Sequence, residues 1–252
     1  MNPDLVAPTA PPAPYGLLSS ILWTAAGIAA WFLAQLVLLF AYYNWQNSVA
    51  PGSVDLAQLA TDGTMLAITV IAAAPVWVGV MVLAARRRGW RARDYLALIP
   101  PRKGEILFGI ACLAPLLVAF DLATYAFGRD VVPSFMRDSY ASAKLAGSLP
   151  LFFIAVVVAG PIGEEIAFRG FLFRGLSATW LGIFGTLAVT AGLWAAMHVQ
   201  YDLIELGQIF LIGLLLGWLR WASGSTLLTI ILHMLANLGA TLEAMIKVEW
   251  LS

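Results

Sequence analysis

Two adjacent carboxylates, Glu164 and Glu165, lie inside a long apolar stretch, within the segment GPIGEEIAFRGFLFR. An ionised group in hydrocarbon costs about 2.5 kcal/mol or more, so such residues usually face a bundle interior or a wet cavity and carry function. On a helix, Glu165 shares a face with Arg169 four residues later, whereas Glu164 points about 100° away. We therefore expect Arg169 to hold Glu165, and Glu164 to face a cavity, where a carboxylate can accept and return a proton.

The chain has two histidines, and both lie in apolar segments of its second half. His198 ends the run WAAMH, and His233 begins HMLAN, in which Asn237 follows four residues later on the same helix face. Imidazole can exchange protons near neutral pH or bind metal, and an asparagine amide can stabilise a developing oxyanion. A lone histidine in an apolar helix is more often a hydrogen-bonded core residue, but this combination of residues favours a functional site.

A purely structural alternative is that the two glutamates neutralise Arg169 and Arg174 near the membrane interface. Such a pair would not need to lie beside Gly160–Pro161, where the missing proline N–H predicts a kink. A broken helix at membrane depth is tolerated where it lines a cavity or is buried in protein. The position of the glutamates therefore favours a site over simple charge neutralisation.

The composition is that of an integral membrane protein. Of the 252 residues, 61% are hydrophobic and 11% are charged, whereas a soluble domain carries about 25% charged residues. The formal net charge is zero and there is no basic patch, so we expect no nucleic-acid partner. The partners expected instead are the lipid bilayer and a membrane-associated peptide or protein substrate.

Apolar runs of about 20 residues predict an all-α fold, a polytopic transmembrane helical bundle of about seven spans, or eight if the segment 128–148 adds one. Residues 1–16, rich in proline and alanine, are expected to be a disordered tail, and residues 17–252 a single transmembrane domain. In the sixth span, Gly213 and Gly217 would allow close approach of a neighbouring helix. The predicted spans are residues 17–43, 64–85, 104–127, 149–175, 180–199, 203–221 and 225–246.

The basic residues predict the orientation of the chain. Half of the fourteen fall in the second loop, namely Arg86, Arg87, Arg88, Arg91, Arg93, Arg102 and Lys103. By the positive-inside rule this loop is cytoplasmic. Two spans precede this loop, so we expect a cytoplasmic N-terminus and an external C-terminus. We also expect the protein to lie in a bacterial inner membrane.

One geometric difficulty concerns depth in the membrane. Counting at about 1.5 Å per residue puts Glu164 towards the cytoplasmic end of its span, but His198 towards the far end of the next. We expect the fourth helix to be long, tilted and kinked at Pro161, with a cavity that opens to the cytoplasm.

Together these motifs resemble the CPBP family of intramembrane proteases (CAAX protease and bacteriocin-processing, or Abi), which includes the type II CAAX prenyl endopeptidases. The resemblance covers about residues 149–240, the expected catalytic core. Trp194 stands where the family commonly has phenylalanine, which exchanges one large aromatic for another. The matching positions are Glu164, Glu165, Arg169, His198, His233 and Asn237.

The resemblance implies an endopeptidase that cleaves a membrane-associated polypeptide, lipidated or not. Glu164 and His198 would activate a water for attack on the peptide carbonyl, and His233 with Asn237 would steady the oxyanion. Glu165 would complete the catalytic set, with Arg169 supporting it. No cofactor is required by this mechanism.

Three other interpretations stay open at this point. Glu164, His198 and His233 are also a ligand set that a catalytic zinc could use, which would make the enzyme a metalloprotease. A non-catalytic scaffold or bacteriocin-immunity protein could retain the motifs by descent. A proton or ion transporter could use Glu164 and His198 as a relay.

Overall fold

The computed structural model describes residues 12–50 and 59–251, and all regular elements in these ranges are helical. This confirms the predicted all-α class. Most of the predicted disordered tail, residues 1–11, lies outside the described ranges. Between the long helices lie three shorter ones: α4 (Ala92–Tyr95), α6 (Ser134–Leu145) and α10 (Gly182–Ala196).

Within the described ranges, six helices are long and apolar enough to cross a membrane, which makes this a multi-pass integral membrane protein. Their positions agree with six of the seven predicted spans. They are α1 (Leu17–Val49), α3 (Gly63–Arg87), α5 (Lys103–Ala126), the continuous run Leu149–Ser177, α11 (Leu203–Ser223) and α12 (Thr226–Trp250).

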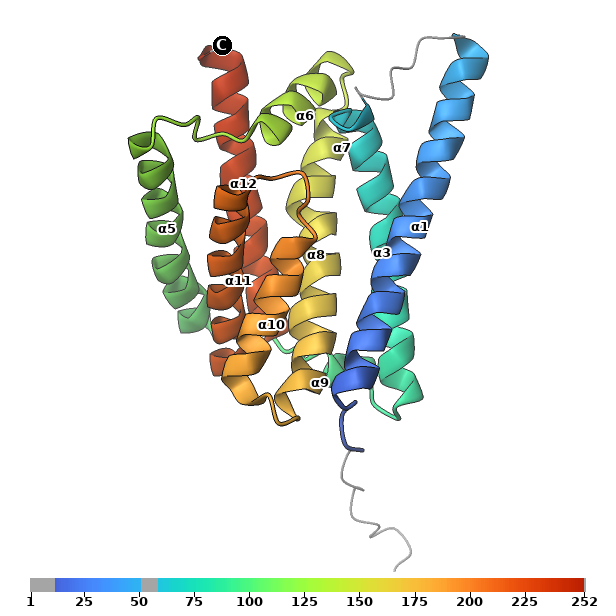
Figure 1. The fold of residues 1–252 in the computed structure, drawn as a ribbon, viewed down its shortest axis with the longest axis vertical. Coiled ribbons are helices and arrows are strands. Elements are labelled where there is room, and N and C mark those ends of the chain that lie inside the picture. Colours follow the sequence, from blue (N-terminus) through green and yellow to red (C-terminus); the bar gives the residue numbers. More distant parts are fainter. Residues whose placement is uncertain (1–11, 51–58, 252) are drawn as a thin grey trace, which may run out of the picture.

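The remaining predicted span, 180–199, is the 15-residue helix α10. At 1.5 Å per residue α10 is about 22 Å long, shorter than the hydrocarbon layer of about 30 Å. The rest of the distance is covered by the irregular segment that leads to α11. In Figure 1 this segment rises from the end of α10 to the start of α11. The chain thus still changes sides here, and the start of α1 and the end of α12 lie at opposite faces of the bundle.

The fourth span alternates between α-helical and wider π-helical turns rather than bending at one point. It consists of α7 (Leu149–Phe153), η1 (Ile154–Ala159), α8 (Gly160–Glu165), η2 (Ile166–Leu172) and α9 (Phe173–Ser177). Pro161 has no N–H to donate to the preceding turn, which is consistent with the wide turn that ends just before it. The six residues of α8 therefore present both glutamates between two π-helical segments.

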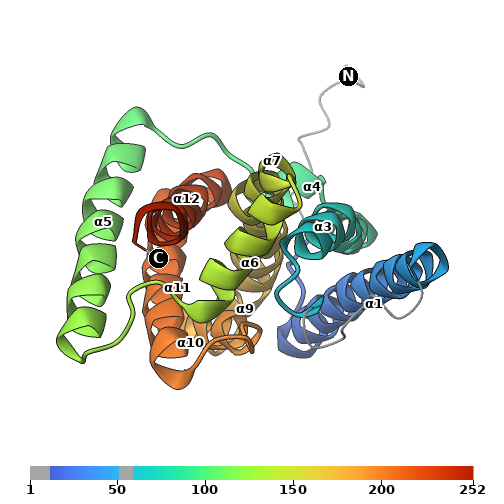
Figure 2. The same cartoon turned by 90° about the horizontal axis from the view of Figure 1, so that it is seen from above.

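The helices form a bundle with α5 at one edge and α1 at the other (Figures 1 and 2). Between these edges lie α12, α11, α10 and the fourth span, with α3 beside α1. The start of α1, the end of α3, α4 and α9 lie at one face of the bundle, which also holds the arginine-rich second loop. The loop that carries α6, and the C-terminus, lie at the other face.

The close approach predicted for the sixth span is present between α10 and α11. A Cβ added at Gly213 would lie 2.9 Å from Ala191 Cβ and 3.1 Å from Trp194 Cε3. A Cβ added at Gly217 would lie 2.8 Å from Leu187 Cδ2. The absence of a side chain at Gly213 therefore lets α11 press directly on the part of α10 that carries Trp194.

Gly213→Ala should destabilise the protein by about 1 to 3 kcal/mol, because the added methyl must displace the α10 backbone. Gly207→Ala is the matched control, since it lies in the same helix and its added Cβ meets nothing within 4 Å. Thermal unfolding of both purified variants in detergent measures the difference. Equal unfolding temperatures for the two variants would show that the α10–α11 contact is not tight.

Candidate active site

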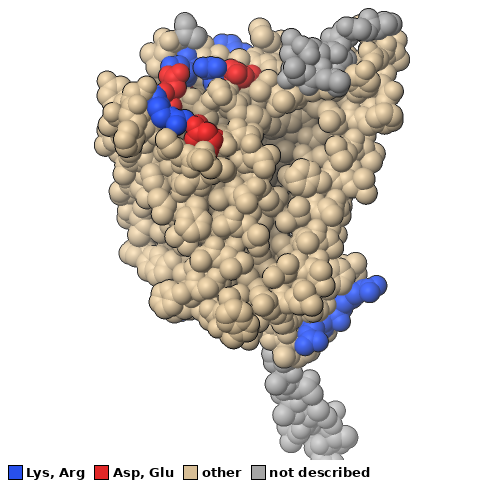
Figure 3. Space-filling view, in the orientation of Figure 1, with Lys and Arg blue, Asp and Glu red and all other residues tan. Residues whose placement is uncertain are grey.

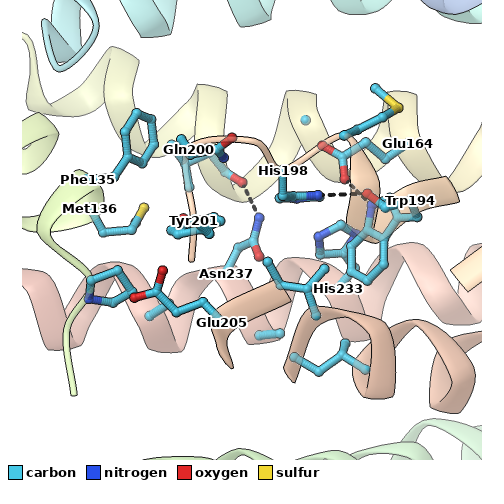
Figure 4. A pocket seen from close by; sticks show the side chains of 18 of the residues that line it. Phe135, Met136, Glu164, Trp194, His198, Gln200, Tyr201, Glu205, His233 and Asn237 are labelled. Atoms are coloured by element: carbon cyan, nitrogen blue, oxygen red, sulfur yellow. Dashed lines mark hydrogen bonds between the residues drawn. The ribbon is translucent and has the colours of Figure 1, made fainter. Parts of the chain in front are cut away.

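A cavity of about 440 Å³ is lined by residues of α1, α3, α5, α6, the fourth span, α10, α11 and α12. Four of the predicted site residues line it: Glu164, His198, His233 and Asn237. Figure 4 shows their side chains converging from three parts of the chain, together with Trp194 and Tyr201. The tertiary structure thus brings the three sequence motifs to one place.

Glu164 faces this cavity, as predicted from its place on the helix. One carboxylate oxygen, Oε2, accepts a hydrogen bond of 2.6 Å from the indole Nε1 of Trp194 (Figure 4). This bond joins α8 to α10 across the cavity wall. The indole holds the carboxylate in one orientation and leaves its other oxygen, Oε1, for a different partner.

Glu165 points away from the cavity into the protein, where it and Arg169 are fully buried. Arg169 Nη1 donates to Glu165 Oε1 at 2.9 Å, which confirms the predicted pair. Arg169 Nη2 donates to the backbone carbonyl of Gly213 at 3.1 Å, and the guanidinium lies 4.4 Å from the centre of the Trp194 ring. The ion pair therefore ties the fourth span to α10 and α11.

His233 lines the cavity and also contacts the buried pair of Glu165 and Arg169. Its Nδ1 lies 3.1 Å from Glu165 Oε1, and a carboxylate oxygen accepts, so Nδ1 carries the proton. Its side chain is only 4% exposed. The other ring nitrogen, Nε2, is therefore the one available to the cavity, and it can donate a hydrogen bond only when the ring is protonated on both nitrogens.

Whereas His233 can act as a hydrogen-bond donor, His198 can act as a proton acceptor. Its Nδ1 lies 2.9 Å from the backbone carbonyl of Trp194, and the carbonyl accepts, so the proton again lies on Nδ1. The Nε2 lone pair of the neutral ring is then free to accept a proton. The ring is held between Trp194, in an edge-to-face contact, and Tyr201, in a stacked one.

Asn237 lies one turn beyond His233 on α12, as predicted. Its Nδ2 donates to the backbone carbonyl of Val156 at 2.8 Å. Val156 belongs to the π-helical segment η1, so the amide also supports the irregular part of the fourth span. An amide nitrogen carries two hydrogens, and the second remains for a ligand in the cavity.

The expected resolution of the depth difficulty was only partly right. The fourth span is long, 29 residues, but the decisive feature is that α10 ends at Ala196. The chain then turns, with Met197 N donating to Trp194 O, and His198 lines the same cavity as Glu164. The indole of Trp194 contacts both Glu164 and the ring of His198, so the three groups lie together.

The expected opening of the cavity towards the arginine-rich face was wrong. Besides the site residues, its lining comes from α1, α3, α5, the fourth span, α11 and α12, and from a group of residues at the α6 face. That group belongs to α6, to the start of α11 and to the segments that precede these helices, and it comprises Val131, Pro133, Phe135, Met136, Gln200, Tyr201 and Glu205. The physical reason is the short α10, which leaves the α6 side of the bundle open beyond His198.

The donor arrangement does not fit a preformed metal centre. Within the described ranges, no group of three or more His, Cys, Asp or Glu side chains is placed to hold a metal ion. The hydrogen bonds of His198, His233 and Glu164 occupy one ring nitrogen of each histidine and one carboxylate oxygen, so it is the placement of the side chains, and not these bonds, that disfavours the zinc set Glu164, His198 and His233.

Two residues important to this geometry were not assigned a site role from the sequence. The motif marks Trp194 only as an aromatic residue four positions before His198, although its indole donates to Glu164. Tyr201 lies three residues after His198 and stacks on it. Tyr201 also lines the cavity, where its hydroxyl can donate a hydrogen bond.

Arg169→Met should lower the stability by about 3 to 5 kcal/mol, because removing one partner leaves the Glu165 carboxylate buried without its counter-charge. Arg137→Met is the matched control, since Arg137 pairs with Asp138 at the surface, and exposed pairs contribute about 0 to 1 kcal/mol. Thermal unfolding in detergent compares the two. A loss at Arg169 no larger than at Arg137 would contradict the role given to the buried pair.

Comparison with known proteins adds an independent observation. Residues 146–239 match the family described as Type II CAAX prenyl endopeptidase Rce1-like. A protein of Escherichia coli described as "Uncharacterized 24.3 kDa protein" is 32% identical over 134 residues, which is 51% of this chain. The match spans 59% of the length of that relative. No solved structure shows significant similarity to this chain.

Proposed function

We propose that the protein is an intramembrane endopeptidase that cleaves a membrane-associated polypeptide, an activity in keeping with the match of residues 146–239 to the Rce1-like type II CAAX prenyl endopeptidase family. The observation that carries the proposal is the convergence of Glu164, His198, His233 and Asn237 on one cavity inside the bundle. These groups include a base and two donors, which is what hydrolysis of an amide requires.

In the proposed reaction, a water molecule lies between Glu164 and the Nε2 of His198. Its oxygen attacks the carbonyl carbon of the scissile bond while Glu164 or His198 accepts its proton. The carbonyl oxygen becomes an oxyanion, which receives hydrogen bonds from protonated His233 and from the free N–H of Asn237. When the C–N bond breaks, the stored proton passes to the departing amine nitrogen, and both products leave with their charges balanced.

The neighbours of these groups have positioning roles. Trp194 holds Glu164, and its own backbone carbonyl selects the tautomer of His198. Glu165 accepts the hydrogen bond from His233 Nδ1 and so orients the imidazole ring, while Arg169 pairs with Glu165 and holds it in place. The two adjacent glutamates therefore have different tasks: Glu164 handles protons, and Glu165 supports the oxyanion donor.

We propose a bacterial inner membrane as the location, with the N-terminus in the cytoplasm. The arginine-rich second loop supports this orientation. The substrate is a polypeptide that reaches the membrane by its own anchor, and a prenylated peptide is one class to be tested beside unmodified ones. A transporter or a non-catalytic scaffold would use the same cavity without producing cleaved peptide, so product analysis separates the three functions.

Glu164→Gln and His198→Ala should each lower cleavage by about 10²-fold to 10⁴-fold, the usual contribution of a general base. Glu243→Gln is the matched control, because Glu243 also lines the cavity but makes no contact with the proposed water. The purified variants, in liposomes with a library of membrane-tethered peptides, are compared by mass spectrometry of the products. Unchanged cleavage in both site variants would reject the assignment.

Asn237→Ala should lower kcat by about 10²-fold to 10³-fold and leave KM unchanged, because an oxyanion donor acts in the transition state rather than on the bound substrate. If Asn237 only supports η1 through Val156, the substitution would instead lower the unfolding temperature while kcat stays near that of the unaltered enzyme. Steady-state kinetics and thermal unfolding on the same preparation distinguish these results.

A further inference from the structure

The two faces of the bundle differ in how their basic residues are compensated. At the α6 face, each basic side chain in the described ranges has a carboxylate partner within 4.0 Å. The pairs are Arg129 with Asp202, Arg137 with Asp138, Lys144 with Glu249 and Lys247 with Asp130. This face therefore carries mixed charge and little excess of either sign, as its red and blue side chains in Figure 3 show.

The opposite face has a clear excess of positive charge. It holds seven basic residues between positions 86 and 103, against Asp94 and Glu105 as the acidic ones there. Arg91 and Arg102 approach these two carboxylates only at 4.0 Å, and both arginine side chains are 91% exposed. In Figure 3 the lower edge shows blue side chains alone. By the positive-inside rule, this arginine-rich face lies in the cytoplasm.

The protein is closed between the site and the arginine-rich face. Below Glu164 along the fourth span, the side chains are almost completely buried from Ile166 to Leu172. Beyond them, Arg220 Nε donates to the carbonyl of Arg169 and to Thr226 Oγ1, each at 3.0 Å. Thr226 Oγ1 in turn donates to the carbonyl of Leu96 at 2.7 Å. A packed, hydrogen-bonded layer thus separates the cavity from the cytoplasmic side.

On the α6 side the same cavity continues to exposed polar residues. Gln200 lines it and is exposed, and Glu205 and Gln208 line it and are half-buried. These residues lie where α10 joins α11, at the face whose charges are paired. Water and a peptide can therefore reach Glu164 from the α6 face, whereas the packed layer blocks the other side.

From these observations we propose that the site takes its substrate from the extracytoplasmic side of the membrane. This inference rests on the proposed function and narrows it: the substrate class is an exported or membrane-anchored polypeptide whose scissile bond lies outside the cytoplasm, near the outer end of its anchor. Polypeptides presented on the cytoplasmic surface are excluded from the cavity by the layer around Arg220 and Thr226.

Cysteine labelling tests the direction of access without requiring activity. The natural thiol is first removed by Cys112→Ser, since Cys112 is the chain's one cysteine. Gln200→Cys then reports on the cavity entrance, and Ser177→Cys, which is exposed at the end of α9, reports on the arginine-rich face. A membrane-impermeant maleimide is applied to spheroplasts, to inside-out vesicles and to detergent-solubilised protein.

In spheroplasts we expect labelling of Gln200→Cys at least tenfold above that of Ser177→Cys, and the reverse in inside-out vesicles. Labelling of Gln200→Cys from the cytoplasmic side, or only after detergent is added, would overturn the proposal. Because the labelling does not depend on peptide cleavage, its result stands even if the protein proves not to be a protease.

A second arm tests the substrate class. One cleavable peptide is fused to either end of a single-span anchor, so that it is displayed outside or inside the cytoplasm, and each fusion is co-expressed with the protein. Cleavage of the external display, lost with Glu164→Gln, supports the inference. Cleavage of the cytoplasmic display overturns it while leaving the proposed function intact. Cleavage of neither counts against the proposed function, and the labelling result then decides access alone.

Discussion

The buried ion pair between Glu165 and Arg169 is the interaction on which the site depends. Both side chains are fully removed from solvent, so each requires the other as counter-charge. Arg169 also binds the carbonyl of Gly213, and Glu165 binds His233. Three helical segments are therefore held in register by one charged cluster. Glu164, the residue before Glu165, takes no part in this cluster, and its side chain faces the cavity.

The second constraint is the length of α10. A helix that crossed the whole membrane would carry His198 past Glu164 and cover the cavity. Because α10 ends after 15 residues, His198 and Tyr201 lie on the irregular segment that follows, where they line the same cavity as the Glu164 carboxylate. The backbone carbonyl of Trp194, near the helix end, is then available to bind His198 Nδ1. The same interruption opens the cavity on the α6 side.

Much of the site could be predicted from the sequence because helical periodicity decides which residues share a face. The pairing of Glu165 with Arg169, the free position of Glu164 and the shared face of His233 and Asn237 all follow from spacings of one or four residues. Hydropathy likewise indicated the membrane helices, and the Gly213 spacing indicated a close helix contact. Each of these predictions depends only on the residues of one helix and on the face of that helix to which they belong.

What only the tertiary structure decided is how separate helices meet. The bond from Trp194 to Glu164, the attachment of His233 to Glu165 and the engagement of Asn237 with Val156 each join residues at least 30 positions apart. No periodic pattern contains such distances, since they depend on where α10 stops and how closely α11 packs on it. The side on which the cavity opens has the same origin, and there the expectation from sequence failed. Spacing along the chain determined which groups could act, and packing between helices determined where they act.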